Sequence, residues 1–169
     1  MINDITALRG DKKLAKIVND YEVPICLMHM KGNPKDMQVN PDYDDVVMEI
    51  CNFLKERTKF AISSGIKKEN ILIDPGIGFG KRTGRGIEDN CEILRRLSEL
   101  KTLGFPIVVG ASRKTFISNV CGGGKPLAIH ERLEGSLAAA IVAVVNGADI
   151  VRVHDVKETR RCVDLADSI

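Results

Sequence analysis

Five groups of polar residues have the side chains for chemistry, and each lies at or just past the end of a short apolar run. The groups are Asn3-Asp4, "MHMKGNP" at 28–34, "DPGIGFGK" at 74–81, "GASRK" at 110–114 and "RVHD" at 152–155. Together they offer carboxylate, guanidinium, ammonium and imidazole groups. Such a set can hydrogen-bond a polar ring and hold an anionic tail. The sequence therefore indicates a site for a small anionic ligand.

The stretch "ILIDPGIGFGK" at 71–81 places a carboxylate at the end of an apolar run and then glycines at every second position. A carboxylate such as Asp74 can accept two parallel N–H groups from an amidine-like edge. Gly76, Gly78 and Gly80 carry no side chain, so a flat ligand could approach the backbone. The letters match neither a Walker loop nor a Rossmann fingerprint. A plain glycine-rich turn, with the aspartate capping the next helix, stays open as an alternative.

Basic residues follow the last two apolar runs. In "GASRK", Ser112 precedes Arg113, a planar fork, and Lys114, a point charge, which leave the strand in opposite directions. Arg152 and His154 are two apart on a predicted strand, hence on one face, where they would form an anion site suited to diphosphate. A solvated basic turn and a structural histidine are the alternatives. No His, Asp and Glu set has the spacing of a tight metal site, so Mg²⁺ would arrive with a phosphate ligand.

The elements that must position these groups alternate along the chain. Apolar, β-rich runs lie at 2–5, 23–28, 71–73, 106–109 and 150–153, and helical spacing at 14–18, 46–54, 93–100, 133–145 and 156–166. Such alternation predicts parallel strands joined by crossover helices. Every strand delivers polar groups at its C-terminal end, which favours a barrel over an open doubly wound sheet. Because a barrel needs eight strands, we predict an incomplete (β/α)₈ TIM barrel of about five strands, forming one domain over 1–169.

Composition excludes several classes of function. The 169 residues are 44% hydrophobic, the net charge is +2 and aromatic residues are 4%, so neither a basic stripe nor a stacking platform argues for nucleic acid. The longest apolar run, 137–145, is too short to cross a bilayer, and no signal-peptide pattern opens the chain. The five cysteines have no CxxC spacing, which indicates reduced thiols. We expect a cytoplasmic protein.

Six stretches in order resemble the dihydropteroate synthases, a family of pterin-binding TIM-barrel enzymes. They are "INDI", "MHMKGNPKDMQ", "ILIDPGIGFGK", "IVVGASRKTFI", "ERLEGSLAAAI" and "IVRVHDV". The resemblance implies an enzyme of folate biosynthesis that joins p-aminobenzoate to 6-hydroxymethyl-7,8-dihydropterin diphosphate and releases pyrophosphate with help from Mg²⁺. It also implies sulfonamides as competitors for the p-aminobenzoate position and a homodimer formed through the late helices.

The resemblance further implies roles for single residues. The pterin would be bound by Asn3, Asp74, Gly78 and Lys114. The p-aminobenzoate position would be bordered by Phe79, Ser112 and Arg113. The diphosphate would be held by Arg152 and His154, which with Lys114 form the expected catalytic set. The family's Mg²⁺ ligand belongs to an N-terminal part without a counterpart in this chain.

Two departures from the family keep other functions open. The loop at 81–90 is longer than usual and adds Arg82 and Arg85, and the family's N-terminal strands and loops have no match. A truncated, inactive pterin-binding module is therefore the main alternative, and a pterin-dependent corrinoid methyltransferase is the second. The paired Arg152 and His154 argue against the second, because that reaction needs no anion grip. His29 is expected to line the barrel mouth as a hydrogen-bonded residue.

Overall fold

The computed structural model describes residues 1–84 and 86–169, so the sequence hypothesis about Arg85 lies outside the described residues. Its parallel strands are β1 (Ile2–Asp4), β2 (Ile25–Met28), β3 (Ile71–Asp74), β6 (Val108–Val109) and β7 (Ile150–Val151). β1, β2 and β3 pair in that order, and β6 pairs with β7. A parallel bridge between Ile73 and Ile107 joins the two groups.

The order of the strands across the sheet is their order along the chain. A doubly wound sheet would reverse its order at a switch point, whereas here the sequence β1-β2-β3-β6-β7 runs without reversal. This is the arrangement of consecutive strands in a β/α barrel. The predicted five parallel strands are therefore confirmed, and they form an open arc.

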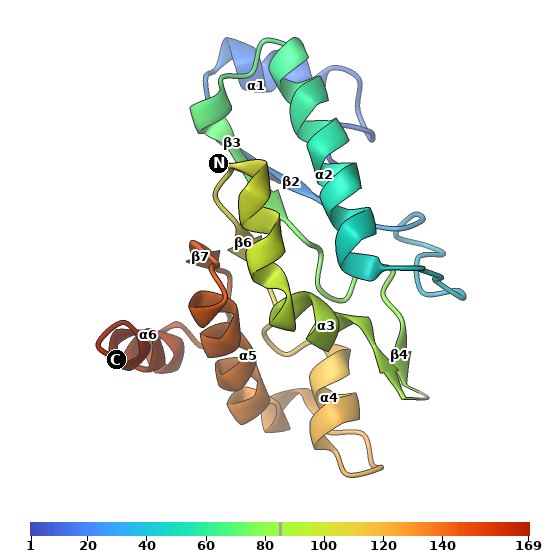
Figure 1. The fold of residues 1–169 in the computed structure, drawn as a ribbon, viewed down its shortest axis with the longest axis vertical. Helices are drawn as coiled ribbons and strands as arrows, with labels where there is room; N and C mark the ends of the chain where they lie inside the picture. Colours follow the sequence, from blue (N-terminus) through green and yellow to red (C-terminus); the bar gives the residue numbers. More distant parts are fainter. Residues whose placement is uncertain (85) are drawn as a thin grey trace.

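Helices follow the strands in chain order, from α1 at the top of Figure 1 to α4, α5 and α6 in its lower half. The α-helices are α1 (Leu14–Asp20), α2 (Val46–Ser63), α3 (Asp89–Arg95), α4 (Thr115–Cys121), α5 (Leu133–Val145) and α6 (Val156–Ala166). The 3₁₀-helices are η1 (Lys68–Asn70), η2 (Leu97–Leu103) and η3 (Ile129–Glu131). Within the described residues, no helix is both long and apolar enough to cross a membrane.

Three local features differ from the sequence expectations. The helical spacing at 93–100 resolves into α3 and then the tighter η2. The helix α4 was not expected, because its seven residues include β-branched side chains of low helix propensity. Strands β4 (Thr83–Gly84) and β5 (Ile87–Glu88) pair antiparallel within the long loop at 81–90, which shows no hydrophobic alternation.

The two faces of the sheet have different neighbours. Ile73, Ile107 and Val109 pack into the main core with buried side chains of α2, α3 and η2. On the other face Cys26, Leu72 and Val108 form a small apolar cluster. Side chains alternate between faces along a strand. The second face is therefore the inner face of the arc, toward which the residues two positions further along each strand also point.

Candidate functional site

The strand register brings three of the predicted site residues to the inner face. Asn3 pairs with Cys26 across β1 and β2, and Met28 pairs with Asp74 across β2 and β3. Val108 pairs with Ile150, so Arg152 follows on the same face just beyond β7. Asn3 and Arg152 are exposed, whereas Asp74 is only 1% exposed. A buried carboxylate thus lies between polar groups that solvent can reach.

Asp74 ends β3, and the loop that follows it orients its side chain. Its carboxylate accepts a hydrogen bond from the backbone N–H of Gly76 at 2.7 Å. Burial raises the pKa of Asp74, while that hydrogen bond and the positive charges of Arg152, Lys81 and Lys114 act in the opposite direction. The carboxylate is thus largely desolvated and surrounded by cations, an environment in which a ligand's N–H groups would bind strongly.

Two of the three loop glycines have a reason different from the one expected. A Cβ on Gly76 would lie 1.9 Å from the carbonyl oxygen of His29, and one on Gly80 would lie 2.4 Å from that of Lys31. Both glycines also have positive φ, +72° and +59°. Their lack of a side chain lets the loop after β3 pack on the backbone that follows β2. This contact therefore accounts for the two glycines without any ligand.

Gly78 is the loop glycine that adjoins the candidate site. A Cβ there would lie 3.2 Å from Cδ of Lys114. The Lys114 ammonium lies 4.1 Å from the centre of the Phe79 ring, a cation–π contact. Burial, and then the charge of Arg152, lowers the pKa of Lys114. The structure thus brings together Gly78, Phe79 and Lys114, which sequence reasoning had taken from two separate motifs.

A cavity of about 370 Å³ opens beside this cluster. It is lined by Gly110, Ser112, Arg113, Lys114, Ile129, Arg152 and His154. β7 ends at Val151, so Arg152 and His154 lie in the following loop and not on a strand as predicted. They line the cavity together all the same. A Cβ on Gly110 would lie 2.6 Å from Nη2 of Arg152, so this glycine leaves room for the guanidinium.

Ser112 and Arg113 have partners that the sequence did not reveal. Nδ1 of His154 lies 3.0 Å from Oγ of Ser112, which also accepts the backbone N–H of His154 at 3.3 Å. The Arg113 guanidinium donates to both carboxylate oxygens of Asp155, at 2.5 and 3.1 Å, and holds the pKa of Asp155 below its usual value. Arg113 has a φ of +59°, and its N–H donates to Ser136. Both side chains thus orient their neighbours at the cavity wall.

Lys81 is a buried residue to which sequence reasoning gave no role. It is 1% exposed, and its ammonium donates to the carbonyls of Gly76 at 3.0 Å and Phe79 at 2.8 Å. Its Nζ also lies 3.1 Å from Nδ1 of His29, which confirms the expected hydrogen-bonded His29. Burial lowers the pKa of Lys81 to about 7 and that of His29 to about 2. The only signal in the sequence was the lysine that closes "GFGK".

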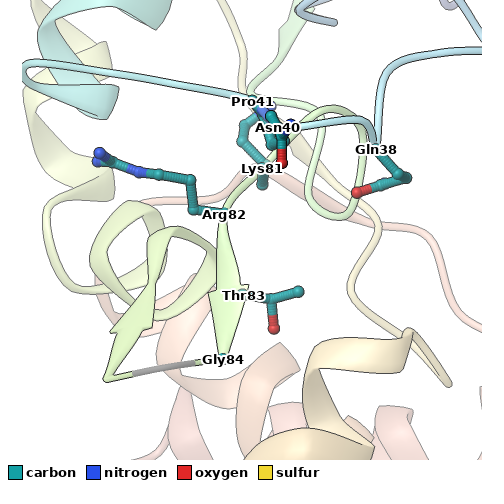
Figure 2. Close-up of a pocket in the computed structure, with 7 residues that line it drawn as sticks. All are labelled: Gln38, Asn40, Pro41, Lys81, Arg82, Thr83 and Gly84. Atoms are coloured by element: carbon teal, nitrogen blue, oxygen red, sulfur yellow. The ribbon is translucent and has the colours of Figure 1, made fainter.

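The added residue Arg82 is held by the protein itself. Its guanidinium binds Asp89 at 3.1–3.2 Å and donates to the carbonyl of Tyr43 at 2.8 Å. Figure 2 shows its side chain extending away from Lys81, at a second cavity of about 330 Å³. That cavity is lined by Gln38, Asn40, Pro41, Lys81, Arg82, Thr83 and Gly84. The long loop is thus fastened to α3 through Asp89.

The residues of the cavity beside Lys114 suit an anion and not a metal ion. Among the described residues, no three His, Cys, Asp or Glu side chains are grouped closely enough to hold a metal. The polar groups at the cavity are mainly guanidinium, ammonium and imidazole. These groups donate hydrogen bonds to phosphate oxygens. Mg²⁺ would be held at this cavity mainly by water and by the oxygens of an anionic ligand.

Comparison with known proteins gives consistent matches along the chain. The model of a family described as pterin binding enzyme matches residues 1–154. The dihydropteroate synthase of Neisseria meningitidis is 43% identical over 160 residues, which cover 94% of this chain and 54% of that protein. The dihydropteroate synthase of Escherichia coli is 44% identical over 159 residues, covering 94% and 53%. The chain thus spans about half the length of these curated relatives.

Solved structures give the same result. The Yersinia pestis dihydropteroate synthase, solved with a sulfonamide drug complex, has 37% identity and a TM-score of 0.90, and the match covers 99% of this chain and 58% of that one. The Xanthomonas albilineans dihydropteroate synthase, solved with 4-aminobenzoic acid, has 42% identity and a TM-score of 0.87, covering 99% and 56%. These matches confirm the predicted fold, a part of a TIM barrel that is not closed.

Proposed function

Because the chain belongs to the family of pterin-binding enzymes, we propose that it acts as a dihydropteroate synthase, condensing a dihydropterin diphosphate with p-aminobenzoate and releasing pyrophosphate. The observation that carries the proposal is the buried carboxylate of Asp74, which shares the inner face with a cation-lined cavity. One group recognises a ring with paired N–H donors, and the other accepts an anion. The two halves of a pterin diphosphate have these chemistries.

The pterin is bound in this proposal at the ends of β1 and β3. Asp74 accepts the two N–H groups of the aminopyrimidine edge, and Asn3 adds a hydrogen bond from β1, on the other side of β2. Gly78 leaves the ring room, and Lys114, already placed against the Phe79 ring, reaches the pterin. Burial of the carboxylate supports this assignment, because a desolvated acceptor gains most from a ligand that supplies donors.

The diphosphate is held by Arg152 and His154. With Nδ1 of His154 turned to Ser112, the other ring nitrogen is left to donate to a phosphate oxygen. The bond between the pterin methylene carbon and the diphosphate oxygen breaks, and its electron pair leaves with the diphosphate. The aniline nitrogen then uses its lone pair to bond the cation-like carbon and loses a proton. The chain's part is to position the reactants and to stabilise the charge of the leaving group.

The p-aminobenzoate lies in this proposal between Phe79 and the turn of Ser112 and Arg113. The matched Xanthomonas albilineans enzyme was solved with 4-aminobenzoic acid, and the Yersinia pestis enzyme with a sulfonamide. These ligands of the related enzymes support p-aminobenzoate as second substrate and sulfonamides as competitors. Arg113 is bound to Asp155, so its guanidinium would contribute orientation and not a free charge.

The remaining proposals concern the surroundings of the reaction. The resemblance implies Mg²⁺ bound with the diphosphate, and no role given above depends on it. A homodimer is supported by exposed apolar side chains on the last two helices, among them Val145, Val156 and Leu165. The cytoplasm is supported by the five free cysteines.

The experiment is pyrophosphate release by the 169-residue chain, given the pterin diphosphate, p-aminobenzoate and Mg²⁺. Release that depends on p-aminobenzoate would support the synthase. Calorimetric titration with the same pterin diphosphate gives the second readout. Binding without turnover would assign the chain to the alternative, a pterin-binding module. A folded chain that neither binds nor turns over the pterin would refute both.

A further inference from the structure

Lys81 lies beneath the glycine loop and is bonded to three acceptors. Its Nζ is within 3.1 Å of the carbonyl oxygens of Gly76 and Phe79 and of Nδ1 of His29. The two carbonyls belong to opposite ends of the turn that contains Gly78. A single side-chain nitrogen thus ties both ends of this turn to the residue that follows β2.

The number of donors matches the number of acceptors in two different protonation states. A lysine ammonium has three N–H donors and no acceptor. In that state it satisfies both carbonyls and an unprotonated Nδ1, so the His29 proton is on Nε2. A neutral lysine amine keeps two N–H donors for the carbonyls and offers a lone pair. It then accepts a hydrogen bond from His29 if the imidazole proton has moved to Nδ1.

We propose that Lys81 is the positioning residue of the pterin-binding loop and that it is proton-coupled to His29. When the ammonium releases one proton to solvent, the neutral imidazole shifts its own proton from Nε2 to Nδ1, and all three hydrogen bonds survive. The loop therefore keeps its shape in both states. The part of this inference that concerns the pterin rests on the proposed function, whereas the coupling to His29 does not.

Burial and charge allow this exchange near neutral pH. Both side chains are almost inaccessible, at 1% for Lys81 and 5% for His29. Burial lowers the pKa of Lys81 to about 7, and that of His29 to about 2, so the imidazole stays neutral throughout. The charged groups around the pair are Asp74 at the end of β3, Asp89 of α3, Lys114 before α4, and Arg9 and Lys31 beside His29.

The loop has further ties that make Lys81 testable on its own. The N–H of Gly78 donates to Oδ1 of Asn90 at 2.7 Å, and the carbonyl of Gly78 accepts from Gln38 at 2.8 Å. These bonds fix the middle of the turn, whereas Lys81 fixes its ends. Removal of the lysine should therefore loosen the turn without unfolding the chain.

The first test is made on the unchanged chain, and a variant of His29 serves only to assign its signals. Nitrogen-15 NMR of the histidine-labelled chain is recorded from pH 6 to 8.5, and the signals of His29 are assigned with His29→Gln. We expect the protonated and unprotonated ring nitrogens of His29 to exchange places with a midpoint near the pKa of Lys81. A His29 that keeps one tautomer over this range would overturn the coupling.

The second test measures the loop through its ligand. Calorimetry gives the affinity of the chain and of Lys81→Met for 6-hydroxymethyl-7,8-dihydropterin at pH 6 and 8.5. We expect the variant to bind about tenfold more weakly at both values, as for the loss of about 1.4 kcal/mol, while the unchanged chain varies by less than about threefold. If the affinity of the unchanged chain falls as Lys81 loses its proton, the loop does not keep its shape in both states. If Lys81→Met binds normally, Lys81 does not position the loop.

The two tests separate this inference from the proposed function. A chain that binds no pterin at either pH, yet shows the tautomer exchange, would refute the proposed function and leave the coupling standing. A chain that binds the pterin but shows no exchange would refute the coupling alone. Lys68→Met, at a lysine outside the loop, serves as the control for loss of a lysine.

Discussion

Replacing Gly110 by alanine should displace the Arg152 guanidinium while leaving its charge in place. The added Cβ would lie 2.6 Å from Nη2 and 3.0 Å from Cζ of Arg152, so the guanidinium must retreat by more than half an ångström. The backbone of Gly110 does not have a positive φ, so alanine can adopt it. The chain should therefore fold normally, because the atoms that must move are the far end of a flexible side chain.

The magnitude follows from the bond that is lost. A hydrogen bond to a charged group contributes about 1.5–3 kcal/mol, and Arg152 is exposed, which favours the lower value. A loss of about 1.4 kcal/mol is roughly a tenfold weaker Kd. We expect this loss for the pterin diphosphate, and less than about twofold for the diphosphate-free pterin, because Asp74 and Gly78 are not disturbed.

The assay is calorimetric titration of the chain and of Gly110→Ala with both ligands. Arg152→Met provides the upper limit, since it removes the guanidinium entirely, and thermal unfolding shows whether both variants are folded. Equal losses for the two ligands would refute the assignment of Arg152 to the diphosphate. An unchanged affinity for the diphosphate form would refute the argument that Gly110 makes room for it.

Three further outcomes are expected. Asp74→Asn should weaken pterin binding by about a hundredfold, because a buried charge-assisted pair is lost. The control Asp20→Asn, on exposed α1, should leave pterin binding unchanged. If Asp74→Asn keeps its affinity in the calorimeter, Asp74 does not bind the pterin. Burial raises the pKa of Asp74 above the ordinary 3.8, so the folded chain binds this proton more tightly than the unfolded chain, and stability falls as pH rises through the folded pKa. In urea unfolding at pH 7, Asp74→Asn should therefore be more stable than the unchanged chain, and a lower midpoint would argue against the desolvation. Gly76→Ala should destabilise the folded chain by more than the about 1–2 kcal/mol that a left-handed backbone alone costs, because its Cβ meets the His29 carbonyl. The control Gly84→Ala is also at positive φ, but no described atom lies within 4 Å of its added Cβ, so it should show only the backbone cost.

The arrangement of the strands was predictable from the sequence, because apolar runs and polar ends recur with the period of β/α units. That Asp74 stands at the end of a strand was predictable for the same reason. The boundary of β7 was less certain. Its strand ends at Val151, and the Arg152–His154 pair is brought together by the loop and the cavity instead.

The parts that escaped prediction depend on contacts between distant segments. No local pattern shows that Lys81 turns inward onto His29, 52 positions away, or that Asp155 binds Arg113 across 42 positions. The glycines illustrate the same limit. Their spacing suggested an open floor for a ligand, whereas Gly76 turns its bare Cα to the backbone carbonyl of His29. Sequence shows where side chains are absent, and only the fold shows what occupies the space.

The packing of Gly76 and Gly80 on main-chain carbonyls has an evolutionary consequence. The loop rests on the backbone carbonyls of residues 29 and 31 and not on their side chains. Its position therefore does not depend on which side chains these two residues carry. Substitutions at Lys31 or Phe79 can change the side chains around the loop without changing these contacts between main-chain atoms. The side chains around Gly78 can thus vary while the backbone of the loop stays where it is.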